Sequence, residues 1–505
     1  MEALAHVISR RAIWLFIVLA GPALAGGLEG VRESVFKVRT VMQDPDYGSP
    51  WRLRAQRSGS GTGFYIGDNR ILTNAHVVAH GRYVTVEREG DSTQYVAEVK
   101  FIAHDCDLAL LTLKDPAPFR GMKALELGPL PALHSPVTTV GYPMGGEQIS
   151  ITQGIVSRIG YNYYTHPGDR QHLLVQVDSA INPGNSGGPV LQGGEVVGVA
   201  FQAFTSAENT GYIIPTPIVR RFLADIADGK YHGHPEDGIL VQTDVMNNPS
   251  AAAFYGLARG HGVRVVTVLD HTSAAGKILP GDVLTAINDQ TIGLDGRIKY
   301  AGERIDFEIL YDLALAGDKV RFDVVRDGKP MEVEVPVEAA RPRFQRGNTY
   351  PLHPKFVLYG GMVFTGLSRN YLQIWGRNWY QKAPLLLRYL QRNVFFTERF
   401  KSAEDIIVIS SRLAHPVNSY ARDRETAVVD TVDGQVINSF ANLVSGLRDA
   451  KGPFVRVGLF ERDDPLVLAK ADAIKAGDEI KKKYGVDLPE WLHGTEVDGT
   501  LRDGE

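Results

Sequence analysis

Short apolar runs separated by Gly, Pro and Asn turns dominate residues 31–215. This pattern is typical of an all-β domain, and its length suits two barrels. Residues 216–229 are amphipathic with helical spacing, so they predict a helix that closes this domain. Residues 231–238 read as a linker and predict an exposed hinge; a metal site formed by the two histidines in this stretch is the alternative.

Two further segments, residues 238–340 and 350–485, mix strand and helix patterns and predict two α+β domains. A long aromatic insertion interrupts the second segment. Its aromatic side chains predict a packed core more often than a binding surface: Tyr371, Trp375, Trp379 and Tyr380. Residues 486–505 are expected to form a C-terminal tail. A chain of 505 residues accommodates about three domains of roughly 150 residues each.

The amino terminus resembles a targeting segment. Paired arginines at positions 10 and 11 precede the apolar run 12–20, and Ala23-Leu24-Ala25 has the small-residue spacing of a signal peptidase site. We therefore expect residues 1–25 to be a signal peptide of an exported protein, in the bacterial periplasm. An uncleaved membrane anchor is the alternative, although the run is shorter than the ~20 residues of a spanning helix. Secretory and twin-arginine export both stay open.

Net charge and cysteine count limit the classes of binding partner and the ways in which the fold can be stabilised. A net charge of −4 gives no reason to expect nucleic acid. Cys106 is the single cysteine, so an intrachain disulfide is impossible and stability must come from core burial. We expect no cofactor and no metal.

A glycine-rich turn at residues 182–188 presents Ser186 between two apolar stretches. A serine hydroxyl is a poor nucleophile at neutral pH, so chemistry there needs a base and donors for an oxyanion. The backbone N–H groups of Gly184 and Ser186 are candidates for those donors. A merely flexible turn is the alternative reading.

Candidates for the base and its orienting acid lie earlier in the chain. His76 follows an apolar strand, and both Asp105 and Asp107 lie at the start of an apolar run. Residues two apart in a strand share a face, so periodicity does not choose between the two acids. The pair His76 and His80 has a zinc-binding spacing, but Val77 stands where a zinc protease needs its glutamate, so we reject zinc there.

Three stretches together resemble the motifs of the Deg/HtrA serine proteases: residues 73–78, 107–109 and 184–189. The resemblance covers about residues 31–229 and implies a chymotrypsin-like domain. It selects Asp107 over Asp105, so that His76, Asp107 and Ser186 form a catalytic triad, and it assigns the amides of Gly184 and Ser186 to an oxyanion hole.

The same arrangement implies a primary specificity pocket. Its base is Ala180, six residues before Ser186, and its wall comprises Val199, Ala200 and Phe201. No charge lies at this base. We expect the pocket to prefer small or medium aliphatic side chains and to reject Lys and Arg, which would be buried without a partner.

Residues 238–340 resemble a PDZ domain, and residues 350–485 resemble a second, divergent one. The candidate loop for a peptide C-terminus comprises Gly260, His261, Gly262 and Val263. The layout is similar to the plant-type Deg group with two PDZ-like domains, and it implies that the second domain assists assembly. Family resemblance also implies a homo-oligomer, a trimer or a multiple of trimers.

The sequence thus predicts a mainly β protein with a two-barrel protease domain at residues 31–229 and two α+β PDZ-like domains. Its expected activity is that of a serine endopeptidase that cleaves unfolded or damaged exported proteins through an acyl-enzyme. The alternative is a PDZ adaptor or chaperone scaffold with little proteolysis, and the intact triad favours the protease.

Overall fold

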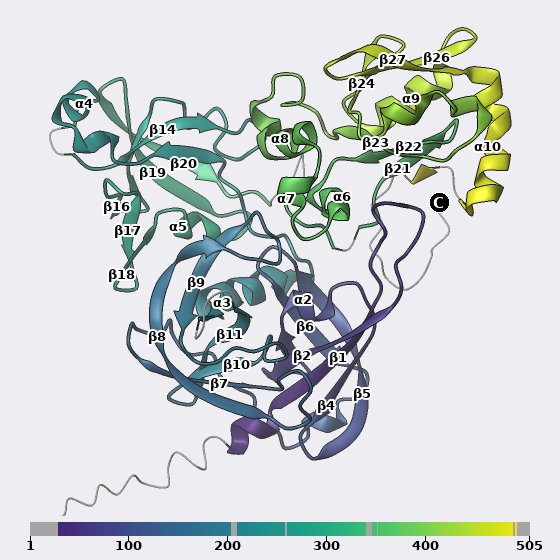
Figure 1. Ribbon diagram of the computed structural model, residues 1–505. Helices are drawn as coiled ribbons and strands as arrows, with labels where there is room; N and C mark the ends of the chain where they lie inside the picture. The colour runs from purple at the N-terminus through teal and green to yellow at the C-terminus, as the bar shows by residue number, and fades with distance from the viewer. Residues whose placement is uncertain are drawn as a thin grey trace, which may run out of the picture.

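The computed structural model describes residues 29–203, 210–257, 260–339, 346–350, 352–487 and 490–491. The predicted signal peptide and most of the predicted tail lie outside these residues. Figure 1 shows two barrels side by side, with two further units above them. Within the described ranges, no helix has the length and apolar character needed to span a membrane.

The first barrel is closed by six antiparallel strands in the order β1-β2-β3-β6-β5-β4. These strands are β1 (Val35–Met42), β2 (Arg57–Tyr65), β3 (Ile71–Thr73), β4 (Gly81–Arg88), β5 (Asp91–Ala103) and β6 (Leu108–Leu113). One short helix, α2 (Ala75–Val78), follows β3 directly. Strand β3 is buried throughout and pairs with both β2 and β6, which fixes the start of α2 against the barrel.

The second barrel is closed in the order β10-β11-β12-β9-β8-β7. Its strands are β7 (Pro136–Gly141), β8 (Ser150–Tyr163), β9 (Gln171–Val177), β10 (Pro189–Gln192), β11 (Glu195–Ala203) and β12 (Gly211–Pro215). The predicted closing helix is α3 (Thr216–Asp225), which buries Ile218, Val219 and Phe222. The two-barrel prediction is confirmed.

A third unit follows, with the sheet order β13-β14-β15-β19-β20 and β16 attached to β15. The strands are β13 (Ile239–Gln242), β14 (Val263–Val268), β15 (Val283–Ile287), β16 (Gln290–Thr291), β19 (Lys319–Arg326) and β20 (Lys329–Pro336). A separate hairpin, β17 (Arg297–Tyr300) and β18 (Glu303–Asp306), precedes helix α5 (Ile309–Asp312), and helix α4 (Pro249–Phe254) joins β13 to β14.

The fourth unit has two four-stranded sheets, β23-β22-β21-β28 and β25-β24-β26-β27. The strands are β21 (Phe356–Tyr359), β22 (Met362–Gly366), β23 (Ile407–Arg412), β24 (Val429–Val432), β25 (Gln435–Val436), β26 (Phe454–Leu459), β27 (Arg462–Ala469) and β28 (Glu490–Trp491). Its main helices are α9 (Phe440–Asp449) and α10 (Lys470–Tyr484).

The aromatic insertion lies between β22 and β23 and forms α6 (Arg369–Leu372), α7 (Trp379–Lys382) and α8 (Leu385–Asn393). Tyr371 is fully buried in the core of this insertion, and Trp375 and Trp379 are partly buried against that core. Tyr380 is 55% exposed. Core packing therefore accounts for three of the four predicted aromatic residues.

The hinge prediction for residues 231–238 is wrong in one respect. His234, Pro235 and Gly238 are buried, because this segment is held between the second barrel and the third unit. Arg221 of α3 donates to the carbonyl oxygen of Gly233, and Asp225 accepts hydrogen bonds from the amides of His232 and Gly233. The segment is a packed connection held by these hydrogen bonds.

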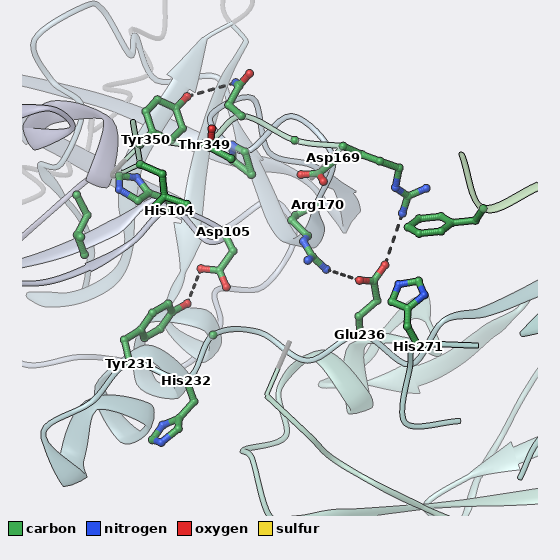
Figure 2. Close-up of a pocket in the computed structure, with 18 residues that line it drawn as sticks. His104, Asp105, Asp169, Arg170, Tyr231, His232, Glu236, His271, Thr349 and Tyr350 are labelled. Carbon is green, nitrogen blue, oxygen red and sulfur yellow. Dashed lines mark hydrogen bonds and ion pairs between the residues drawn. The ribbon is translucent and has the colours of Figure 1, made fainter. Parts of the chain in front are cut away.

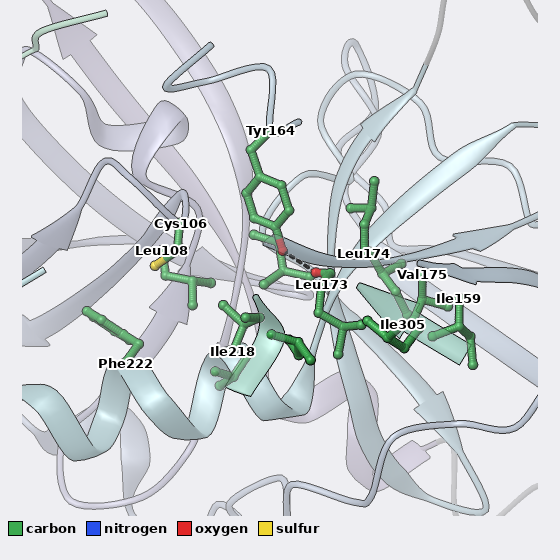
Figure 3. Packing of buried hydrophobic residues seen from close by; sticks show 14 of the residues in the cluster. Cys106, Leu108, Ile159, Tyr164, Leu173, Leu174, Val175, Ile218, Phe222 and Ile305 are labelled. Carbon is green, nitrogen blue, oxygen red and sulfur yellow. Dashed lines mark hydrogen bonds between the residues drawn. The ribbon is translucent and has the colours of Figure 1, made fainter. Parts of the chain in front are cut away.

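The hydrophobic core of the second barrel continues into the third unit. Ile305 of β18 belongs to the same buried cluster as Ile159 and Leu174 of the barrel, and Figure 3 shows these side chains together. Figure 3 also shows Phe222 of α3 beside Leu108 and Cys106 of the first barrel. Helix α3 thus packs where the two barrels meet.

Replacing the buried Phe222 tests this packing. Phe222→Ala should lower the free energy of unfolding by about 3–5 kcal/mol, because it removes a fully buried ring and leaves a cavity between the barrels. The measurement is the urea midpoint of the protease transition. Phe254→Ala is the control, since that ring is 81% exposed and its removal should leave the midpoint nearly unchanged. Equal shifts in both variants would contradict the packing described.

Candidate active site

His76 and Asp107 form a two-point contact. His76 lies in α2, and its Nδ1 is 2.6 Å from Oδ2 of Asp107. The backbone N–H of His76 donates to Oδ1 of the same carboxylate at 2.7 Å. Asp107 is fully buried, so the carboxylate fixes both the position of the imidazole and the tautomer with hydrogen on Nδ1.

The backbone of Asp107 is fixed as well. Its carbonyl oxygen accepts from Nδ2 of Asn74 at 2.9 Å and from the amide of Ala75 at 3.2 Å. Asp107 has a φ of 53°, a conformation that Asp tolerates better than most residues, and this turn delivers its carboxylate to α2. Asn74 was not predicted from the sequence, although it stands in the motif around His76.

The pKa of His76 reflects these contacts. Burial alone would lower it, but the charge of Asp107 and the hydrogen bond to it outweigh burial and raise the pKa of His76 above its ordinary value. The side chain of His76 is 34% exposed, so the ring is open on one side. It is placed to exchange a proton with a group in the cleft.

The turn that carries Ser186 depends on its glycines. Gly184 has a φ of 103° and Gly187 a φ of 86°, in the region that favours glycine. A side chain at Gly184 would collide with the backbone of Tyr142 and Met144, and one at Gly187 would collide with the carbonyl oxygen of Thr62. The turn therefore packs directly against backbone of the first barrel, at Thr62, and of the second barrel, at Tyr142 and Met144.

Ser186 and His76 both lie beside Phe201. Oγ of Ser186 donates to the carbonyl oxygen of Phe201 at 3.1 Å, and the ring of Phe201 lies 6.5 Å from the ring of His76 between centroids. In the described part of the chain, no hydrogen bond joins Ser186 Oγ to His76. The serine hydroxyl is thus engaged by the carbonyl oxygen of Phe201 instead of by the imidazole.

Thr62 organises the turn from the first barrel. Its Oγ1 donates to the carbonyl oxygen of Gly184 at 2.7 Å and accepts from the amide of Tyr142 at 2.9 Å. Its backbone N–H donates to the carbonyl oxygen of Ser186 at 2.8 Å. Both carbonyls of the turn are thus tied to Thr62. Across the described ranges, the amides of Gly184 and Ser186 have no recorded acceptor, which leaves them available to an oxyanion.

Asp105 has different surroundings. Its carboxylate accepts from the hydroxyl of Tyr231, which Figure 2 shows, and from the amide of His234 at 2.8 Å. Burial alone would raise the pKa of Asp105, but His234, Tyr231 and His172 hold it below its ordinary value. The two acids that periodicity could not separate therefore face opposite directions, and Asp107 is the one at His76.

The residues assigned to a specificity pocket lie near the serine turn. Ala180 is exposed, whereas Val199, Ala200 and Phe201 on β11 are buried. The amide of Gly187 donates to the carbonyl oxygen of Ala200 at 2.8 Å, which holds β11 against the turn. The ring of Phe201 packs on Tyr164 at 4.7 Å, so it lies in the core between the barrels.

A cavity of about 340 Å³ opens beside His76. Residues from three parts of the chain line it, including His80 and His166 of the barrels, Tyr350 of the connection to the fourth unit, and Gln373 of the aromatic insertion. Tyr350 stacks on His166 at 3.8 Å between ring centroids, and Nε2 of His166 lies 2.9 Å from Nδ1 of His104 and 3.9 Å from Oδ1 of Asp107. Burial lowers the pKa of His166. The sequence patterns did not predict that these distant segments lie together beside His76.

The predicted peptide loop at residues 260–263 leads into strand β14. Strand β14, which follows it, is already paired with β13 on one side and with β15 on the other. The amide of Gly262 donates to the carbonyl oxygen of Ile292 at 3.0 Å. Strand β15 pairs with β14 at Val263 and Arg264, and the outer edge on this side of the sheet belongs to β13.

Comparisons with known proteins agree with this geometry. Residues 61–199 match the family model of a trypsin-like peptidase domain, and residues 346–490 match that of a PDZ domain. Protease Do-like 2, chloroplastic, from Arabidopsis thaliana is 37% identical over 464 residues, which cover 90% of this chain and 74% of that protein. Putative protease Do-like 3, mitochondrial, from the same plant is 31% identical over 90% of this chain and 78% of its own length.

Among solved structures, the HtrA-type protease AlgW with tripeptide matches with a TM-score of 0.50 and 23% identity, over 64% of this chain and 98% of that one. That similarity concerns the fold. The extent and identity of the match to the Do-like proteases, together with the peptidase and PDZ models, show that this chain is a serine endopeptidase of the Deg/HtrA family.

Proposed function

We propose that Ser186 is the nucleophile of this peptidase, His76 its general base and Asp107 the residue that orients and stabilises the imidazole. The observation that carries this assignment is the two-point contact between Asp107 and His76, which faces a serine turn with two available amides. A carboxylate on Nδ1 leaves Nε2 as the proton acceptor.

In the proposed reaction, Ser186 Oγ attacks the scissile carbonyl carbon while His76 takes the hydroxyl proton. The negative oxygen of the tetrahedral intermediate is held by the amides of Gly184 and Ser186. His76 then protonates the leaving amine, and an acyl-enzyme remains. Water attacks the acyl group with His76 again as base, which releases the carboxylate product and restores the serine.

The primary pocket is proposed to accept small or medium aliphatic side chains. The support is the uncharged set Ala180, Val199 and Ala200, of which Ala200 accepts a hydrogen bond from the amide of Gly187 in the serine turn. A basic side chain there would lose its hydration without gaining a carboxylate partner. A cleavage map dominated by Lys and Arg would contradict this.

We infer that the substrates are unfolded or damaged proteins and that the enzyme works as a trimer or a multiple of trimers. The support is family membership, together with PDZ modules that bind extended peptides. The free strand edge of the third unit, at β13, is the proposed place for a peptide C-terminus. We also propose that residues 238–340 and 350–485 are the two PDZ-like domains.

Export by the amino-terminal segment is proposed from its sequence alone. The names of the plant relatives place those proteins in chloroplasts or mitochondria, and none of the comparisons supports a periplasmic location. The adaptor or scaffold alternative is less favoured, because the chain carries all three residues of the proposed triad.

Removing the hydroxyl of Ser186 tests the nucleophile. Ser186→Ala should abolish labelling by a fluorophosphonate probe and lower kcat for unfolded casein by at least about 10³-fold, because no covalent intermediate can form. Ser135→Ala, at an exposed hydroxyl that donates to the carbonyl oxygen of Ala132, is the control and should label normally. Undiminished cleavage by Ser186→Ala would refute the assignment.

Replacing each of the two acids by asparagine tests which one orients His76. Asp107→Asn should lower kcat about 10⁴-fold, because the amide disfavours the productive tautomer. Asp105→Asn should retain far more activity, since Asp105 contacts Tyr231 and His234 instead.

The pH profile supplies a further prediction. His76 acts as a base only when neutral, and Asp107 raises its pKa, so kcat/KM should fall as pH drops through that raised pKa. In Asp107→Asn the acid limb should move to lower pH, because the charge that raises the pKa is gone. An unmoved limb would show that another group titrates.

A further inference from the structure

A second cluster of histidines and a carboxylate lies away from the serine. It comprises His172 at the start of β9, His234 in the connection after α3, and Asp312 at the end of α5. Their side chains are 2%, 1% and 5% exposed. One ligand atom from each lies within 4.8 Å of the other two, so three distant segments converge on one buried point.

The contacts within the cluster require a positive species between its members. Nε2 of His172 lies 2.9 Å from the backbone carbonyl oxygen of Asp105, so it must carry a hydrogen. Nδ1 of the same ring faces Oδ1 of Asp312 at 2.9 Å. In a neutral imidazole, two sets of lone pairs would oppose each other there. Either a second proton or a metal ion must lie between them.

The surroundings of His172 are those of a metal ligand. Ligating histidines donate their second ring N–H to a carbonyl or carboxylate, as His172 does to Asp105. This bond fixes the ring so that Nδ1 points at Asp312. Nδ1 of His234 reaches the same oxygen, Oδ1 of Asp312, at 2.7 Å.

His234 provides an independent observation. Its Nε2 is buried and has no hydrogen-bonding partner within the described residues. Because Nδ1 contacts Asp312, Nδ1 is the ring nitrogen that faces the cluster. An unpartnered buried nitrogen is costly in a protein interior, and a bond from Nδ1 to a metal ion would help to offset that cost.

The cluster lies on the wall of a cavity of about 320 Å³ between the second barrel and the third unit. Besides Asp312, five carboxyl side chains line this cavity: Asp169, Glu236, Asp237, Asp306 and Glu308. The arginines that line it are two, Arg170 and Arg346. The cavity offers a path for a cation and room for water.

We propose that His172, His234 and Asp312 bind a divalent transition-metal ion of the zinc type. Two imidazoles and one carboxylate form a ligand set that zinc accepts, with a fourth position left for water from the cavity. The present contacts would lengthen by about 0.5 Å, since zinc bonds near 2.0 Å separate tetrahedral ligands more widely than a hydrogen bond does. The ion would clamp the third unit to the second barrel.

Cobalt and zinc binding to the full-length protein tests the proposal without reference to catalysis. After treatment with a chelator and its removal, the wild type should bind about one Co²⁺ per chain with a visible absorption band, and Zn²⁺ should displace it. His234→Gln and Asp312→Asn should lose this band. His232→Gln is the matched control, because Figure 2 shows His232 pointing away from Asp105, and it should bind as the wild type does.

Thermal unfolding provides a second readout in case a variant folds poorly. Zn²⁺ should raise the Tm of the wild type and of His232→Gln, and a chelator should reverse this, whereas His234→Gln should not respond. If the wild type binds no more Co²⁺ or Zn²⁺ than His234→Gln does, and its Tm ignores both zinc and chelator, the proposal is overturned. The positive species is then a proton on His172.

Discussion

The contact between the buried carboxylate of Asp107 and the imidazole of His76 is the constraint around which the active site is arranged. It needs the left-handed turn at Asp107, the short helix after β3, and the hydrogen bonds from Asn74 and Ala75 that hold the turn in place. A buried carboxylate without these partners would be strongly unfavourable. The first barrel therefore supplies an oriented imidazole, and the second supplies the serine turn.

Thr62 connects these two halves. Its hydroxyl and amide hold the carbonyls of Gly184 and Ser186, whose peptide units carry the N–H groups of Asn185 and Gly187. Those two N–H groups donate to the carbonyl oxygens of Asn182 and Ala200, so the backbone of the turn is fixed on both sides of Ser186. The glycines at 184 and 187 make the close approach possible, since a side chain at either position would collide with backbone.

The additional units are packed against the peptidase domain. The core of the second barrel continues into the third unit through Ile305, and the connection around His234 is buried between them. The loop between β1 and β2 reaches the fourth unit, where Trp51 packs on Phe356 at 6.1 Å and Tyr47 contacts Thr349. Tyr350 lies over His166 beside the cleft, so the fourth unit is coupled to the surroundings of His76.

The sequence by itself determined the two-barrel fold, the closing helix and the candidates His76 and Ser186, because these are local signals: alternating apolar runs, turn residues and short motifs. The resemblance to the Deg/HtrA proteases selected Asp107 over Asp105, because strand periodicity does not distinguish residues two apart. Only the tertiary structure decided what distant segments do together. The role of Thr62, the burial of His234, the pairing of β14 with β13 and β15 and the cluster of His172 with Asp312 all arise from contacts between residues far apart in the chain, and such contacts leave no periodic trace in the sequence.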